Sequence, residues 1–234
     1  GMMDRMRHAA MFFGVTDQTR DLVESLYLEY LDALNDHLEL YPYLLGWRPS
    51  IGDFGLLAPM YAHLGRDPYP ARLMQQRATR VYRWVERMNR ADQDAPEYFN
   101  AGSDFLADDE VPETLLTVLR VIAQDFVPET LAAAQHINAW LAENQPDSGA
   151  AAVGRESQAI GMVEFTLRGE TVSALAQPHR FYLLQRVQDL YAALAPEEQA
   201  CVDEMLGACG MSDILSAVLD RRIGREDNLE VWEA

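Results

Sequence analysis

The spacing of apolar residues predicts a chain that is mostly helical. In residues 16–40, apolar side chains recur every three or four positions, which places them on one face of an α-helix. They are Leu22, Leu26, Tyr30, Leu34 and Leu38. Thr16 and Asp17 suit the start of this helix, and Pro42 suits its end. Similar spacing predicts helices over 50–63 and 70–90, and Pro59 should end or kink the first of these two.

Residues 160–175 contain the only strand-like pattern. Apolar and β-branched residues mix there around Arg168 and Gly169, which predicts one small β-hairpin. Helical patterns lie on both sides of it. We expect a helix to begin at Pro112 and run towards Asp125, and Pro128 to open or kink a further one. Three more helices should follow the hairpin over 178–194, 196–208 and 212–222.

The length of 234 residues fits one large domain or two small ones. The sequence Pro-Asp-Ser-Gly at 146–149 interrupts the helical pattern and marks a boundary. We therefore predict a helical domain over residues 1–145 and an extension over residues 146–234. The extension contains the hairpin and three helices, and we expect it to pack on the first domain as one unit.

Composition narrows the class of protein. Apolar residues make up 49% of the chain, and no apolar run reaches the roughly 20 residues of a membrane span. No signal peptide is visible. The two cysteines are too few for a disulfide framework, so we expect a reducing, cytoplasmic localisation.

The net charge of −18 restricts the classes of binding partner that we expect. All 19 basic residues are arginines, against 37 acidic residues. A chain this acidic repels phosphate backbones, which argues against nucleic acid or an anionic membrane as a partner. Eight acids crowd residues 91–119 and six arginines crowd the predicted helix before them, so we expect the acidic segment to fold near that helix and pair with it.

The segment 44–54 reads Leu-Leu-Gly-Trp-Arg-Pro-Ser-Ile-Gly-Asp-Phe. Ser50 can accept a hydrogen bond from the third residue of the next helix, while Asp53 reaches back to the N–H of Ser50. This spacing predicts a structural N-cap motif made by Ser50 and Asp53. Its role is to satisfy backbone donors at a helix start, which supports folding rather than catalysis.

This segment resembles the signature of the C-terminal domain of the glutathione S-transferase family, Leu-Gly-x-x-Pro-Ser-x-x-Asp, which caps a buried helix. The resemblance covers about residues 20–90 and extends through 61–64, 67–68 and 84–88. It implies an all-α fold: a helical bundle of the glutathione transferase C-terminal type, here with a helical extension and one small β-hairpin. It also implies a homodimer, because members of the family pair through helical faces.

In this family a thioredoxin-like N-terminal domain binds glutathione and activates its thiol. The sequence shows no βαβ pattern before residue 20 and no Cys-x-x-Cys. We therefore expect no catalytic residue and no cofactor in this chain, with glutathione used only if a thioredoxin-like half is present in the native protein. The resemblance implies a hydrophobic-substrate pocket, for which the candidates are Tyr27, Tyr30, Trp47 and Tyr61. The alternative is that these aromatic residues only pack in the core.

No metal site is predicted. The five histidines are never paired at the spacing of metal ligands, and the acidic segment lacks the spacing of a calcium loop. Two hypotheses for the function remain. The chain is the helical half of a glutathione transferase-like protein, inactive alone and able to bind a hydrophobic small molecule, or it is a non-enzymatic binding or scaffolding module with the same fold.

Overall fold

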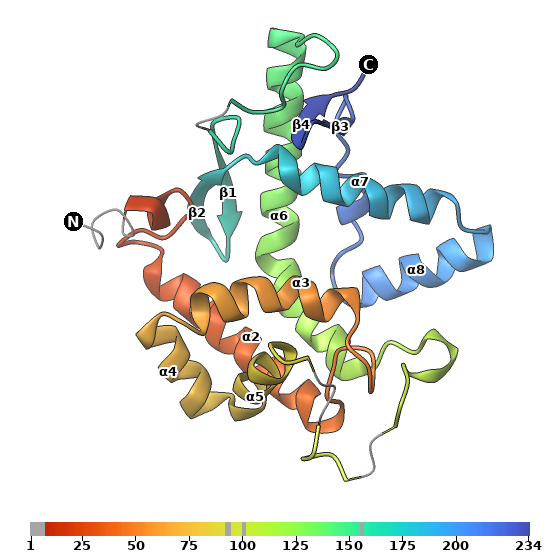
Figure 1. Ribbon diagram of the computed structural model, residues 1–234. Helices are drawn as coiled ribbons and strands as arrows, with labels where there is room; N and C mark the ends of the chain where they lie inside the picture. Colours follow the sequence, from red (N-terminus) through yellow and green to blue (C-terminus); the bar gives the residue numbers. More distant parts are fainter. Residues whose placement is uncertain (1–7, 92–94, 100–101, 155–156) are drawn as a thin grey trace. The chain divides into compact units, whose positions relative to one another are not determined.

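The structure is a computed structural model that describes residues 8–91, 95–99, 102–154 and 157–234. These residues are mostly helical, with two small antiparallel hairpins (Figure 1). The chain forms two compact units, which we call the central unit (residues 24–122) and the terminal unit (residues 1–23 together with 123–234). This division falls at other positions than the boundary predicted at residue 145.

The central unit is a cluster of helices. It contains most of α2 (Arg20–Leu40), all of α3 (Ile51–Pro59), α4 (Pro68–Arg77) and α5 (Thr79–Met88), and the first turns of α6 (Glu113–Asn144). As the sequence predicts, Pro59 is the last residue of α3. A π-helical turn, Met60–Leu64, follows α3, and a short 3₁₀ turn, Ala107–Asp109, precedes α6.

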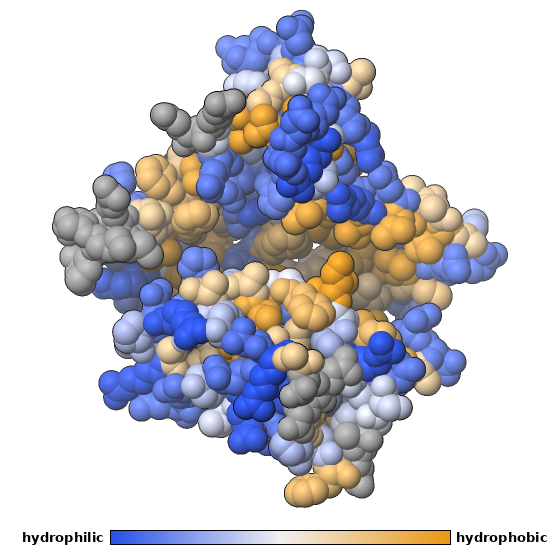
Figure 2. Space-filling view, in the orientation of Figure 1, coloured by the Kyte–Doolittle hydropathy of each residue, from blue (hydrophilic) through white to orange (hydrophobic). Residues whose placement is uncertain are grey.

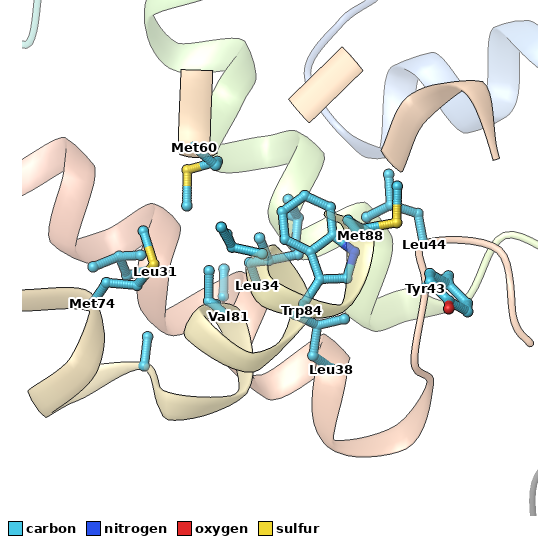
Figure 3. Packing of buried hydrophobic residues seen from close by; sticks show 14 of the residues in the cluster. Leu31, Leu34, Leu38, Tyr43, Leu44, Met60, Met74, Val81, Trp84 and Met88 are labelled. Atoms are coloured by element: carbon cyan, nitrogen blue, oxygen red, sulfur yellow. The ribbon is translucent and has the colours of Figure 1, made fainter. Parts of the chain in front are cut away.

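The core of the central unit lies between α2 and α5 (Figure 3). Leu31, Leu34 and Leu38 of α2 are fully buried, which confirms the apolar stripe read from the sequence. Trp84 and Val81 of α5 are also fully buried against them. Burying one such side chain contributes about 1.5–3 kcal/mol, so this face holds the helices together.

The single helix predicted over 70–90 is wrong, because α4 and α5 are separate. The break is at Ala78, which is fully buried and has φ −132° and ψ 63°. The backbone N–H of Arg80, in the first turn of α5, donates to Oδ1 of Asn35 on α2, 3.1 Å away. A side chain that is distant in sequence therefore accepts a hydrogen bond from a backbone N–H at the start of α5. The sequence pattern near residue 78 does not predict this contact.

The prediction of a first helix that runs towards Asp125 and a further one at Pro128 is wrong in part, because the two are continuous. One helix, α6, runs from Glu113 to Asn144 with Pro128 inside it. A proline in a helix interior costs about 3 kcal/mol. In the terminal unit, buried residues on both sides of Pro128, Val127 before it and Ala133 and Ile137 after it, offset this cost by packing.

The hairpin predicted near 160–175 is confirmed. Strands β1 (Met162–Leu167) and β2 (Glu170–Leu175) pair antiparallel. The two turn residues, Arg168 and Gly169, have φ of 51° and 88°, as the turns favoured by two-residue hairpin loops require. The N-terminal segment joins the outer edge of β2, where the N–H of Leu175 donates to the carbonyl of Phe12 over 3.0 Å.

After the hairpin come α7 (Pro178–Ala192) and α8 (Pro196–Ala208), close to the predicted bounds. The third helix, predicted over 212–222, is wrong. The structure has only a 3₁₀ turn, Ile214–Ser216, and then a second hairpin of β3 (Ile223–Glu226) and β4 (Leu229–Trp232). The fold class is therefore mostly helical with two hairpins rather than one.

Candidate functional site

The start of α3 contains the capping box that the sequence predicts. The N–H of Asp53 donates to Oγ of Ser50, 3.4 Å away, and the N–H of Ser50 donates to Oδ2 of Asp53, 2.8 Å away. The hydroxyl of Ser50 also donates to Oδ2 over 2.7 Å. Ser50 itself is extended, with φ −97° and ψ 172°, as an N-cap residue should be.

Asp53 connects three parts of the central unit. Its side chain is fully buried, and Oδ1 accepts from the N–H of Leu44 and from the indole Nε1 of Trp84, each at 3.1 Å. A buried carboxylate is stable only when hydrogen bonds replace its lost water. The motif therefore ties the turn before α3 to α5, and sequence reasoning missed both partners because they come from the tertiary fold.

Helix α3 presents apolar residues outward. Asp53 is its only buried residue, whereas Ile51 is 92% exposed and Phe54 is 57% exposed. Ala58, one turn further on, is exposed as well. We call Ile51, Phe54 and Ala58 the outer face of α3, and Figure 2 shows apolar residues gathered along this helix. A soluble helix ordinarily buries its apolar side. The helix after the cap, which the resemblance implies is buried, is instead exposed here on its apolar side.

The four aromatic candidates do not share one place. Tyr27, Tyr30 and Tyr61 pack against the core of the central unit. Trp47 instead meets the edges of Tyr41 and Tyr98, with ring centroids 6.2 and 6.1 Å away. Tyr41 follows the last residue of α2, which rises about 1.5 Å per residue, so Trp47 lies roughly 20 Å along that helix from Tyr27.

The hydroxyls of the two α2 tyrosines differ in their partners. Tyr27 donates to the carbonyl of Pro70 over 3.3 Å, and burial raises its pKa to about 12. The hydroxyl of Tyr30 is buried and has no hydrogen-bond partner among the described residues. Burial, with smaller effects of Tyr27 and Asp53, raises its pKa too. Both phenols are therefore protonated at neutral pH, and Tyr30 keeps an unused hydrogen-bonding group.

Tyr61, the third candidate tyrosine, makes a cation–π contact with Arg66. The guanidinium of Arg66 lies 4.2 Å from the ring centroid of Tyr61, and it also donates to the hydroxyl of that tyrosine. This contact is local, five residues apart in sequence. Tyr61 belongs to the π-helical turn Met60–Leu64.

The arginines of α4 and α5 pair with acids, including one from the acidic segment. Arg77 makes a bidentate pair with Asp32, with both N–O distances 2.6 Å. Arg87 is buried and donates to Glu97 over 2.6 Å and to the carbonyl of Pro42 over 2.7 Å. The expectation that the acidic segment folds near this helix is confirmed for Glu97, while Asp92 and Asp94 lie outside the described residues.

Among the described residues, no three side chains of His, Cys, Asp or Glu come together in a way that could hold a metal ion. None of the helices in the same ranges combines the length and the apolar character needed to cross a bilayer.

In comparisons the chain matches no protein-family model, no curated protein sequence and no solved structure.

Proposed function

We propose that this chain is the helical, hydrophobic-substrate half of a glutathione S-transferase-like protein and that it acts together with a thioredoxin-like domain. The observation that carries the proposal is α3, which combines the capping box of Ser50 and Asp53 with an apolar outer face. In the family that the segment resembles, the helix with this cap is buried. The outer face of α3 therefore fits a surface that a second domain covers.

The proposal divides the chemistry between two domains. The thioredoxin-like domain would bind glutathione and activate its thiol, and no residue of this chain is assigned that step. The central unit would supply an apolar wall for the second substrate. Tyr27 and Tyr30 belong to that wall, and because their phenols are protonated they do not act as bases. The hydroxyl of Tyr27 already donates to Pro70, so Tyr30 is the one of the two that is left to donate to a substrate.

The buried hydroxyl of Tyr30 supports a ligand-binding role for this wall. A buried donor without an acceptor costs about 1–3 kcal/mol, and an acceptor from a bound substrate would remove that cost. Trp47, which packs at the other end of α2, is not included in the proposed wall.

The reading frame upstream of Met2 is the first test. An in-frame thioredoxin-like domain supports the proposal. An in-frame stop codon would contradict it and favour the stand-alone binding module, in which a second copy of the chain covers the outer face of α3.

Titration calorimetry with glutathione is the second test. We expect no binding by this chain alone and micromolar binding when it is joined to the thioredoxin-like domain. Phe54→Ser should weaken glutathione binding by the joined protein at least about tenfold, because it disrupts the surface between the domains. Leu40→Ser, at an exposed position at the end of α2, is the matched control. Micromolar binding by this chain alone would overturn the assignment of the thiol site to the other domain.

A further inference from the structure

The terminal unit contains a concave site that involves no residue of α3. It is a cavity of about 360 Å³ beside α6, lined by His136 and Trp140 of that helix and by the segments 151–154 and 159–161. The two residues between these segments, 155 and 156, lie outside the described residues. The volume falls within the range of about 300–1,000 Å³ that is typical of small-molecule sites.

The described lining carries no Asp, Glu or Arg side chain, although the chain as a whole has a net charge of −18. Its walls are small apolar residues and glycines, together with the indole of Trp140. The imidazole of His136 is the one side chain of this lining that can both donate and accept a hydrogen bond, depending on its tautomer. Sites for small uncharged molecules have this composition, mostly apolar with a few polar groups.

Backbone hydrogen bonds hold one wall of the cavity in place. The segment around Ala152 pairs with β4, where the N–H of Ala152 donates to the carbonyl of Glu230 over 2.8 Å. The N–H of Trp232 donates back to the carbonyl of Ala150 over 2.9 Å. These bonds, with the antiparallel bridge between Ala151 and Val231, hold this wall beside β4.

The opposite wall is held against His136. The N–H of Ile160 donates to the carbonyl of Ala176 over 2.8 Å, and the N–H of Ala176 donates to the carbonyl of Gly161 over 3.1 Å. Gly161 has φ +72°, and a Cβ added there would lie 3.1 Å from Nε2 of His136. The backbone thus passes directly beside the imidazole, at a distance that favours glycine and restricts the ring.

The indole of Trp140 stacks on a second tryptophan, Trp232. The rings of Trp140 and Trp232 are stacked, with centroids 6.2 Å apart and planes at 30°. Trp232 is fully buried, and its Nε1 has no acceptor within the described part of the chain. Trp140 is only half-buried, so its ring offers a rigid aromatic surface to the cavity.

We propose that this cavity binds a small, uncharged aromatic molecule that carries a hydroxyl group, a ligand of the phenol class. The aromatic ring packs on Trp140, and the hydroxyl forms a hydrogen bond with the imidazole of His136. An uncharged ligand fits these walls, because the described lining is apolar apart from His136 and the indole of Trp140. All the lining residues belong to the terminal unit and none to α3, so the inference is independent of the function proposed for α3.

Calorimetry with 2-naphthol as the probe tests the proposal. We expect saturable binding with one site per chain. Naphthalene-2-carboxylate, which is charged, and cyclohexanol, which lacks the aromatic ring, should each bind at least about tenfold more weakly. Equal affinity for the three probes, or binding of 2-naphthol that does not saturate, would overturn the proposal.

Variants at two glycines locate the binding. A Cβ at Gly154 meets no atom within 4 Å, so Gly154→Leu should fold normally while its side chain fills the cavity and abolishes binding. Gly207→Leu on the exposed side of α8, where the nearest atom to a new Cβ is 3.7 Å away, is the matched control. His136→Ala should weaken 2-naphthol binding about tenfold. Unchanged affinity in Gly154→Leu would place the binding elsewhere and reject the site.

Discussion

Asp53 accepts hydrogen bonds from two backbone N–H groups, one hydroxyl and one indole, all within the central unit. The residue is short and acidic because the position must both reach back to Ser50 and accept from Trp84. Each buried donor that loses its acceptor costs about 1–3 kcal/mol. The carboxylate therefore matters more for stability than the serine that caps the helix beside it.

Substitutions at the two positions should separate these roles. Ser50→Ala should lower the free energy of unfolding by about 1 kcal/mol, the usual cost of a lost N-cap. Asp53→Ala should lower it by about 3 kcal/mol or more, because several donors lose their acceptor together. Urea unfolding measures both, with Ser148→Ala at an exposed position as the control. The capping role is refuted if the unfolding midpoint of Ser50→Ala equals that of the control.

His37, in the last turn of α2, is a buried titratable group. It is fully buried, with Nδ1 2.9 Å from Oγ1 of Thr114 and Nε2 3.2 Å from the carbonyl of Tyr43. The carbonyl can only accept, so Nε2 carries the proton and Nδ1 accepts from the threonine hydroxyl. Burial lowers the pKa of His37, because the charged imidazolium would lose its water.

This lowered pKa makes stability depend on pH in a defined direction. Above the unfolded pKa of about 6.5, both states are neutral at this residue and its contribution is complete. Below that pH the unfolded chain takes up a proton that the folded chain does not, so stability falls as the pH drops towards the folded pKa. His37→Asn should flatten the unfolding free energy between about pH 6.5 and 5. An equal slope in His37→Asn and in the exposed control His63→Asn would contradict this account.

At the scale of elements, the sequence pattern correctly predicted those elements that interactions between neighbouring residues determine. The hairpin of β1 and β2 follows from strand-forming residues around a two-residue turn, and the cap of α3 follows from two residues three apart. The separation of Trp47 from the three candidate tyrosines could not be predicted. It depends on the tertiary contacts of Trp47 with Tyr41 and Tyr98, beyond the C-terminal end of α2. The same is true of the contacts of Asp53 with Leu44 and Trp84, which join segments of different elements.

The second hairpin carries a signal that sequence reasoning missed. Its turn residues, Asp227 and Asn228, have φ of 47° and 64°, a conformation that short polar residues accept more readily than others. The helix predicted over 212–222 ends before these residues, for which no strand was predicted. In the structure, full burial of Ile223 and Trp232, which face each other across the two strands, stabilises the hairpin instead.

The break between α4 and α5 gives a prediction at this scale. If Asn35 caps α5 from α2, Asn35→Ala should lower the free energy of unfolding by about 1 kcal/mol, because the N–H of Arg80 loses its acceptor. Asp36→Ala, the next residue and an exposed one, should leave it unchanged. Thermal unfolding followed by circular dichroism compares the two variants. Equal melting temperatures would show that the break does not depend on this contact.

At the scale of the whole molecule, charge acts against compactness. Most ion pairs of the described residues are exposed on both sides, such as Arg222 with Asp189, and pairs of this kind contribute about 0–1 kcal/mol. They cannot offset the mutual repulsion of a net charge of −18.

Salt should therefore stabilise the protein near neutral pH. Raising NaCl from about 20 to 300 mM shortens the range of the repulsion and should raise the melting temperature. At pH 4.5, close to the isoelectric point, the same change should have little effect. A melting temperature that falls with salt at pH 7 would mean that the surface ion pairs outweigh the repulsion. Light scattering across the same series tests whether the chain forms the homodimer that its family resemblance implies.

The pairing of Phe12 and Phe13 with β2 has a consequence for how the protein is made. These residues leave the ribosome roughly 160 residues before their partner strand, which at about 5–20 residues per second is a wait of about 8–30 s. Residues 24–122 are complete well before that and can fold while synthesis continues. During this interval the aromatic N-terminal segment lacks its partner strand, so newly made chains are most exposed to aggregation or chaperone capture at that end.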